Sequence, residues 1–269
     1  MEDKEKLWTK DFVLVIIINF LVFLNHLMIL STFPFFIERL GYSDTVSGAC
    51  ATAFSLVAVL ARPFVGWLLD TGRRRVLLGV GLIGMALMPM GYLLIYTALA
   101  SLALAILLRM VHGLSLACAN TSTSTMATDI LPRSRFSEGM GMFGMATALA
   151  TACAPAIGEA LMKRGFGALF GVAAGCMVLS LVLLFCLRTK PLPRVKKSLR
   201  PGDLVEPSAL PASVVVLIFL LTYGALENYI LKFAAAQPGI TVSGGLFFTV
   251  MAVLLFLSRV TIGKLADKR

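Results

Sequence analysis

Eight runs of apolar residues divide this chain, and each is long enough to cross a lipid bilayer. A membrane-spanning helix needs about 20 apolar residues, because each residue adds about 1.5 Å and the hydrocarbon core is about 30 Å thick. Charged residues make up only 14% of the chain, against about 25% in an ordinary soluble domain. We therefore predict an all-α membrane protein with spans at residues 12–36, 43–68, 76–97, 99–129, 139–162, 167–187, 212–233 and 241–262.

The formal net charge of +10 is concentrated between the apolar runs. If the N-terminus lies in the cytoplasm, 17 lysines and arginines fall in cytoplasmic segments and 4 in outer loops. Cytoplasmic segments of membrane proteins carry such an excess. The first run is too long for a cleaved signal peptide and has no small-residue cleavage pattern after it. We therefore predict a multi-pass protein of the cell membrane with a cytoplasmic N-terminus, and no nucleic-acid partner for the positive charge.

Residues that would indicate enzyme or metal chemistry are missing from the sequence. Neither an HExxH motif nor a pair of aspartates at catalytic spacing occurs. The five cysteines all lie inside apolar runs without the spacing of metal ligands: Cys50, Cys118, Cys153, Cys176 and Cys186. We therefore expect no catalytic residues, no metal and no other cofactor.

A short sequence near the end of the second run recurs near the end of the eighth. Residues 61–75 read ARPFVGWLLDTGRRR, and residues 258–269 read SRVTIGKLADKR. Identical residues at a constant offset of 197, in the same place relative to a helix end, indicate an internal duplication. The identical pairs are Arg62 and Arg259, Gly66 and Gly263, Leu68 and Leu265, and Asp70 and Asp267.

The duplication predicts the domain organisation. Residues 1–188 form a six-helix N-terminal half, and residues 189–211, rich in basic residues and prolines, form a cytoplasmic linker. Residues 212–269 hold the first two helices of a C-terminal half. A complete second unit would extend to about residue 385, roughly 115 residues beyond Arg269. We therefore expect either a fragment or a truncated product of a longer gene.

Several of these segments resemble signatures of the major facilitator superfamily. GWLLDTGRRRVLL, after the second run, is similar to the signature loop of that family, and GKLADKR is similar to its second-half counterpart. LLRMVHGLSLA, with Arg109 and Gly113 four apart, resembles the signature of the fourth helix. One difference is that only Thr71 stands between Asp70 and Gly72, where the family pattern has two residues.

The fifth run resembles the antiporter signature of the same superfamily. GMFGMATALATACAPAIGE keeps Gly141, Pro155 and Gly158, whereas Ala150, Ala154 and Glu159 stand where glycine is usual. This resemblance to the 12-helix drug:proton antiporter group implies export of a small molecule by proton antiport with alternating access. It also implies a lipid bilayer, a small-molecule substrate and a proton as partners, and a monomer at full length. The alternatives are an importer or facilitator of the same superfamily and a truncated inactive or regulatory membrane protein.

Charged and polar residues inside the spans are the candidate site. Arg109 lies in the fourth run, where an arginine costs at least about 2.5–3.5 kcal/mol. The family resemblance implies a role for it in proton coupling. The alternative is a packing arginine whose donors are satisfied by neighbouring carbonyl groups. His112, three residues on, lies on the adjoining face and is a candidate for a shared proton relay.

The first and seventh runs supply further candidates. Glu227 falls at about mid-depth of the seventh run, beside Asn228. A carboxyl group buried without a fixed partner can be neutral near pH 7, as a proton carrier requires. An ion pair of purely structural value is the alternative. Asn25 and His26 fall near the middle of the first run, and we expect them to line a cavity shared with the fourth and seventh helices.

The repeated loop is a candidate cytoplasmic gate. Its residues are Gly66, Asp70, Arg73, Arg74, Gly263 and Asp267. The resemblance implies a conformational latch, in which the aspartate pairs with an arginine and with a helix N-terminus of the opposite half. Arg74 follows Asp70 by four residues, so we expect this pairing to survive. The partner helix for Asp70 would lie beyond Arg269.

A run of small hydroxyl residues lies in the fourth span. Residues 120–125 read NTSTST. Such residues let helices approach closely and hydrogen-bond across their interface in a membrane. We expect them to serve packing and not substrate binding.

Overall fold

Helices make up the structure. A computed structural model describes residues 6–99, 101–188, 207–237, 246–251 and 253–254. Its long helices are α1 (Lys10–Arg39), α2 (Asp44–Asp70), α3 (Arg74–Leu94), α4 (Leu102–Ile130), α5 (Phe136–Lys163), α6 (Phe166–Phe185) and α7 (Leu210–Ala236). A π-helical turn (Ile95–Leu99) and two 3-10 turns (Arg133–Arg135 and Pro207–Ala209) complete the elements. No strand occurs in the described ranges.

Seven helices in this part of the chain are long and apolar enough to cross a membrane. They cover the first seven predicted spans to within a few residues, so the prediction of an all-α membrane protein is confirmed. Of the eighth predicted span, 241–262, residues 246–251 and 253–254 are described, and they are helical. The rest of that span lies outside the described residues, as does most of the predicted linker.

Short turns join the first three helices and the fifth to the sixth. The side chain of Thr9 accepts a hydrogen bond from the backbone N–H of Phe12 at 3.2 Å and so caps the start of α1. The turn between α2 and α3 contains Gly72 with a φ of 83°, which a residue with a Cβ atom adopts only with strain. This requirement explains why a glycine follows Asp70 and Thr71 in the signature loop.

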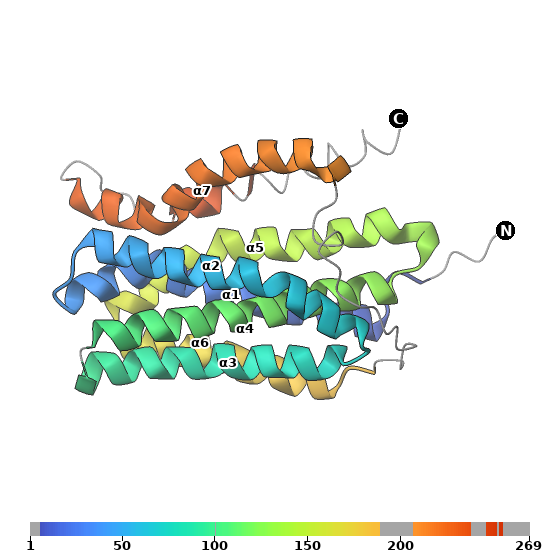
Figure 1. Cartoon of the computed structure of the whole chain (residues 1–269), viewed down its shortest axis with the longest axis horizontal. Coiled ribbons are helices and arrows are strands. Elements are labelled where there is room, and N and C mark those ends of the chain that lie inside the picture. The colour runs from blue at the N-terminus through green and yellow to red at the C-terminus, as the bar shows by residue number, and fades with distance from the viewer. Residues whose placement is uncertain (1–5, 100, 189–206, 238–245, 252, 255–269) are drawn as a thin grey trace.

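The helices run side by side along the long axis of the molecule (Figure 1). Helix α1 is the most enclosed span, because 67% of its most apolar 18-residue segment is buried. It contacts α4, α5 and α6. Helix α2 packs on α4, and α3 packs on α4 and α6. Helix α7 lies along one side, and only 6% of its most apolar 18-residue segment is buried. Its exposed leucines and valines are the surface that a bilayer can solvate.

Glycines set the closest helix contacts. A Cβ atom on Gly113 of α4 would lie 2.2 Å from the carbonyl oxygen of Phe54 on α2. One on Gly158 of α5 would lie 3.0 Å from the carbonyl oxygen of Met28 on α1. Small residues let backbones approach in this way where lipid removes the usual hydrophobic drive between helices.

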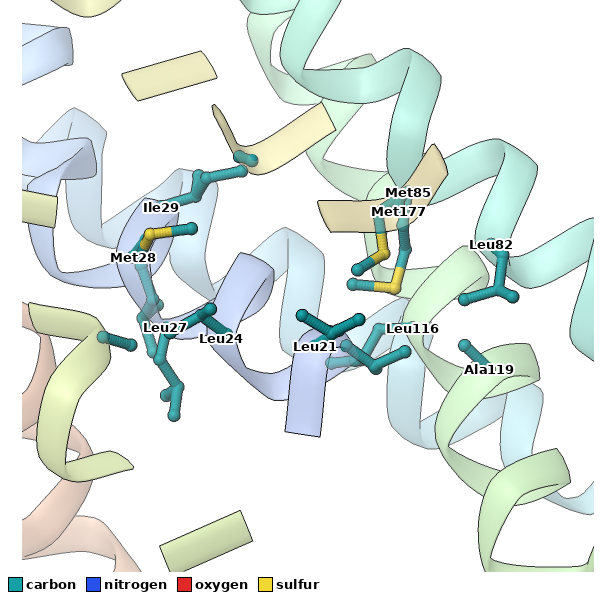
Figure 2. Close-up of a cluster of buried hydrophobic side chains, with 14 of the residues drawn as sticks. Leu21, Leu24, Leu27, Met28, Ile29, Leu82, Met85, Leu116, Ala119 and Met177 are labelled. Atoms are coloured by element: carbon teal, nitrogen blue, oxygen red, sulfur yellow. The ribbon is translucent and has the colours of Figure 1, made fainter. Parts of the chain in front are cut away.

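The apolar core lies between α1, α3, α4 and α6. Met28, Met85 and Met177 are all completely buried there. Figure 2 shows the side chains of Met85 and Met177 together, near Leu116 of α4. In a bilayer, dispersion contacts of this kind hold helices together, and flexible thioether chains fill gaps between them.

The hydroxyl run of α4 takes part in helix packing. Thr123 donates to Asn19 Oδ1 on α1 at 3.0 Å, and Asn19 Nδ2 donates to Thr147 Oγ1 on α5 at 3.0 Å. These two bonds join three helices through the buried Asn19 and Thr123 and the half-buried Thr147. The prediction that this run serves packing is confirmed for Thr123.

Candidate functional site

Arg109 is completely buried about two turns from the start of α4, among aromatic side chains from three other helices. Its guanidinium carbon lies 3.9 Å from the centre of the Phe33 ring on α1 and 5.0 Å from the centre of the Phe54 ring on α2. The Tyr92 hydroxyl of α3 is its one polar side-chain neighbour among the described residues that interacts with it both electrostatically and by a weak hydrogen bond. None of the three guanidinium nitrogens makes a hydrogen bond of normal geometry to a described residue.

The ring contacts only partly compensate for burying this charge. Placing an arginine in a membrane costs at least about 2.5–3.5 kcal/mol, and each cation–π contact returns about 0.5–2 kcal/mol. The two rings therefore offset most of the charge term. They do not accept the in-plane N–H groups, and a buried donor without an acceptor costs a further 1–3 kcal/mol or so. The alternative of an arginine satisfied by backbone carbonyls is thus not what the described residues show.

Two histidines lie in the same aromatic surroundings. The Nδ1 atom of His112 lies 3.2 Å from the Tyr92 hydroxyl, and its Nε2 atom has no described partner. His26 stacks on the Phe54 ring with centroids 5.0 Å apart and planes 6° from parallel, and its Nδ1 atom also has no described partner. The His112 ring meets the edge of Phe54 at 5.5 Å. The expected proximity of Arg109 and His112 is therefore present.

We call the following six side chains the Arg109 cluster: His26 and Phe33 of α1, Phe54 of α2, Tyr92 of α3, and Arg109 and His112 of α4. Chemically, the cluster brings one fixed positive charge and two titratable imidazoles around a single phenyl ring. The close contact of Gly113 with the Phe54 carbonyl sets the separation of α2 and α4 beside it.

Asn25 and His26 point from α1 toward different helices. Asn25 Nδ2 donates to the carbonyl oxygen of Ala173 on α6 at 2.7 Å, whereas His26 faces α2. Consecutive residues of an α-helix point about 100° apart, because one turn holds 3.6 residues. Asn25 therefore joins α1 to α6, and only His26 belongs to the Arg109 cluster.

The candidates on α7 are not brought to this cluster by any described contact. Asn228 is half-buried, and its Nδ2 atom donates to the carbonyl oxygen of Gly224 one turn earlier at 2.7 Å. The backbone of Glu227 belongs to α7, but its side chain lies outside the part of the protein that is described. Its proton-carrying role remains a prediction.

The candidate gate loop lies at the end of α2 and the start of α3. Gly66 is inside α2, Asp70 is its last residue, and Arg73 occupies the N-cap position of α3 without a side-chain capping bond. Arg74 does not pair with Asp70 but forms an ion pair with Asp129, near the end of α4. The carboxylate that pairs with Arg74 therefore comes from the neighbouring α4, and not from Asp70, which is nearer in the sequence. Gly263 and Asp267 fall outside the described ranges.

A second charged group lies at the opposite end of the bundle and was not predicted. Lys232 of α7 pairs with Glu38 Oε2 at 2.9 Å and with Asp44 Oδ1. The Tyr229 hydroxyl donates to the backbone carbonyl of Asp44 at 3.3 Å. Helix α7 is therefore tied by charge to the turn between α1 and α2.

The sequence also did not indicate the aromatic partners of Arg109. Phe33, Phe54 and Tyr92 each occur in a long apolar run in which an aromatic residue is ordinary. The only signal was indirect, because a buried arginine must face some partner.

Comparison with known proteins identifies the family. The family model described as "Major Facilitator Superfamily" matches residues 15–269. Multidrug resistance protein MdtG from Escherichia coli strain 536 is 23% identical over 279 residues, covering 97% of this chain and 67% of that protein. The same protein from strain K12/DH10B matches equally well.

Solved structures agree on the fold. Two crystal structures of a peptide transporter, POT, in complex with sulfate superpose with TM-scores of 0.58 and 0.56 at 21% and 22% identity. Each match covers 84% of this chain, and the chain spans about half (49%) of the length of those transporters. With a family model matched from the first span to Arg269 and a transporter fold in its helices, this chain belongs to the major facilitator superfamily.

Proposed function

We propose that this chain belongs to a secondary active transporter that exports a small molecule in exchange for protons. The observation that carries the proposal is the buried Arg109, which has no described carboxylate partner and lies beside the titratable His112. Secondary antiport requires a site that a proton and a substrate occupy in turn. A fixed charge next to a histidine, between α1, α2, α3 and α4, is suited to that role.

Alternating access is the proposed mechanism. Residues 1–188 and the half that begins at residue 212 rock against one another, and residues 189–211 link them on the cytoplasmic side. We assign the proton-carrying step to Glu227 together with His112, and substrate contacts to Arg109, His26 and Asn228. Because Asn25 is bonded to α6, its role is to hold α1 in place.

The loop at the end of α2 acts as the cytoplasmic gate in this proposal. Gly66, Asp70 and Arg73 form it in the first half, and Gly263 and Asp267 form its counterpart. The ion pair between Arg74 and Asp129 holds the start of α3 against the end of α4 next to this loop. The protein is a monomer of the cell membrane with its N-terminus in the cytoplasm, in contact with lipid on its apolar faces.

Export is supported by the relatives named as multidrug resistance proteins, which match nearly the whole chain. Import or facilitated diffusion is the competing direction. The direction can be tested in cells without their own efflux pumps that make the intact gene product, using a panel of toxic compounds. A compound whose toxicity falls becomes the probe for transport.

Inside-out membrane vesicles then test proton coupling. The probe should enter vesicles only while an imposed pH gradient persists, and a protonophore should abolish its uptake. Replacing Arg109 by Ala and Glu227 by Gln, in separate variants, should each uncouple uptake from the gradient. If both variants retain gradient-driven uptake at wild-type rate, these residues have no part in coupling.

A further inference from the structure

The acidic side chains of the described part of the chain are accounted for without Arg109. They are Asp11, which accepts from the Arg188 amide; Glu38 and Asp44, paired with Lys232; Asp129, paired with Arg74; Glu138, paired with Arg135; Glu159, paired with Lys163; and Asp70. Asp70 lies sixteen residues beyond Phe54 on α2, which is about 24 Å at helical rise. No described carboxylate therefore neutralises the Arg109 cluster.

The geometry leaves particular donors available. Phe33 and Phe54 lie against the guanidinium group of Arg109 at 3.9 and 5.0 Å from its carbon. Its N–H groups point along the plane of the group, and a planar guanidinium presents them as a fork that matches an oxyanion. His112 Nε2 and His26 Nδ1 are additional buried nitrogens without described partners.

We propose that the Arg109 cluster binds the oxyanion of a small organic acid, so that the molecule the protein transports is an organic anion. This inference rests on the proposed transport function for its biological meaning. The oxyanion bonds the guanidinium fork, as carboxylates and phosphates do in paired arginine contacts. An apolar body on the ligand would meet the surrounding aromatic side chains of the cluster. A cationic ligand would be repelled by a fixed positive charge in surroundings that screen it weakly.

Binding to the purified intact protein in detergent tests the inference without any proton gradient. The probes share one ring and differ in charge: benzoate, benzenesulfonate and phenylphosphonate as anions, benzyl alcohol as the neutral form, and benzyltrimethylammonium as the cation. Calorimetry in a dilute Tris chloride buffer, which contains no organic acid, should detect saturable binding of at least one anion and of neither other form. Equal binding of the cation, or of chloride in place of the organic anions, would overturn the proposal, as would no binding of any anion.

Variants locate the site. Arg109→Gln should weaken anion binding about tenfold or more, because the fork and its charge are both lost. Arg62→Gln, the same change at an exposed arginine of α2, should leave binding unchanged. If Arg109→Gln does not fold, Arg109→Lys and His112→Gln carry the comparison, and each should weaken binding. Unchanged affinity in every folded variant of the cluster would refute the assignment.

Glu227 provides the decisive alternative. If its carboxylate is the true partner of Arg109, an anion should bind only after Glu227→Gln removes that carboxylate. That result would contradict the proposal. If the wild-type protein binds an anion but shows no proton-driven transport, the anion site is supported and only the proposed antiport is refuted.

Discussion

Replacing Gly113 by Ala should destabilise the protein and disturb the Arg109 cluster. The added Cβ atom would lie 2.2 Å from the carbonyl oxygen of Phe54 and 3.1 Å from its carbonyl carbon. An ordinary contact needs about 3.4 Å or more, so α2 and α4 must separate by roughly 1 Å. Both sides of the contact are backbone, so no side-chain rotation can relieve it. The movement would carry the Phe54 ring away from Arg109.

The expected change in the free energy of unfolding is the sum of two opposing contributions. Overpacking a well-filled contact costs about 1–3 kcal/mol, and a backbone clash belongs near the upper end of that range. Alanine in place of glycine inside a helix returns up to about 1 kcal/mol. The net loss for Gly113→Ala should therefore be about 2 kcal/mol. At about 2–4 °C per kcal/mol, the melting temperature should fall by about 4–8 °C.

Thermal unfolding of the purified protein in a mild detergent measures this change. Gly175→Ala in α6 is the matched control, because nothing lies within 4 Å of the added Cβ atom. It should keep or slightly raise the melting temperature. If Gly113→Ala melts at the wild-type temperature while the control behaves as expected, the backbones of α2 and α4 are not in contact at Gly113.

Two further changes test the contacts around α7 and His112. Lys232→Met should speed amide hydrogen exchange several-fold in the turn between α1 and α2 and in the end of α7, because both ion pairs are lost; Lys163→Met, which loses only a surface pair, should not. Tyr92→Phe should lower the melting temperature and alter the pH profile of transport, because His112 Nδ1 loses its partner. Tyr96→Phe, at an exposed tyrosine of the following turn, should change neither measurement.

The spans and the charged candidate were predictable from the sequence for one physical reason. Lipid requires about 20 apolar residues for each crossing and makes a charge such as Arg109 conspicuous inside one. The turn after α2 was also predictable, because a charged residue, Asp70, is followed two positions later by Gly72, which tolerates a positive φ. These signals depend on local sequence alone.

The surroundings of the site depend on how each helix is rotated about its axis. Asn25 and His26 are adjacent in the sequence, yet they face α6 and α2 respectively. Arg74 illustrates the same limit, since the nearby Asp70 was visible in the sequence and its actual partner Asp129 is 55 residues away. Contacts between distant helices leave no periodic or local pattern in a single sequence.

Proton-driven export through the Arg109 cluster is tested most directly in liposomes that contain only the purified intact protein. Molecules oriented with their cytoplasmic side outward should take up the probe compound against its gradient when the interior is made acidic. Each molecule taken up should be matched by alkalinisation of the interior, and Arg109→Ala should abolish both changes. Uptake that proceeds without proton movement, or that survives in Arg109→Ala, would contradict the proposed function.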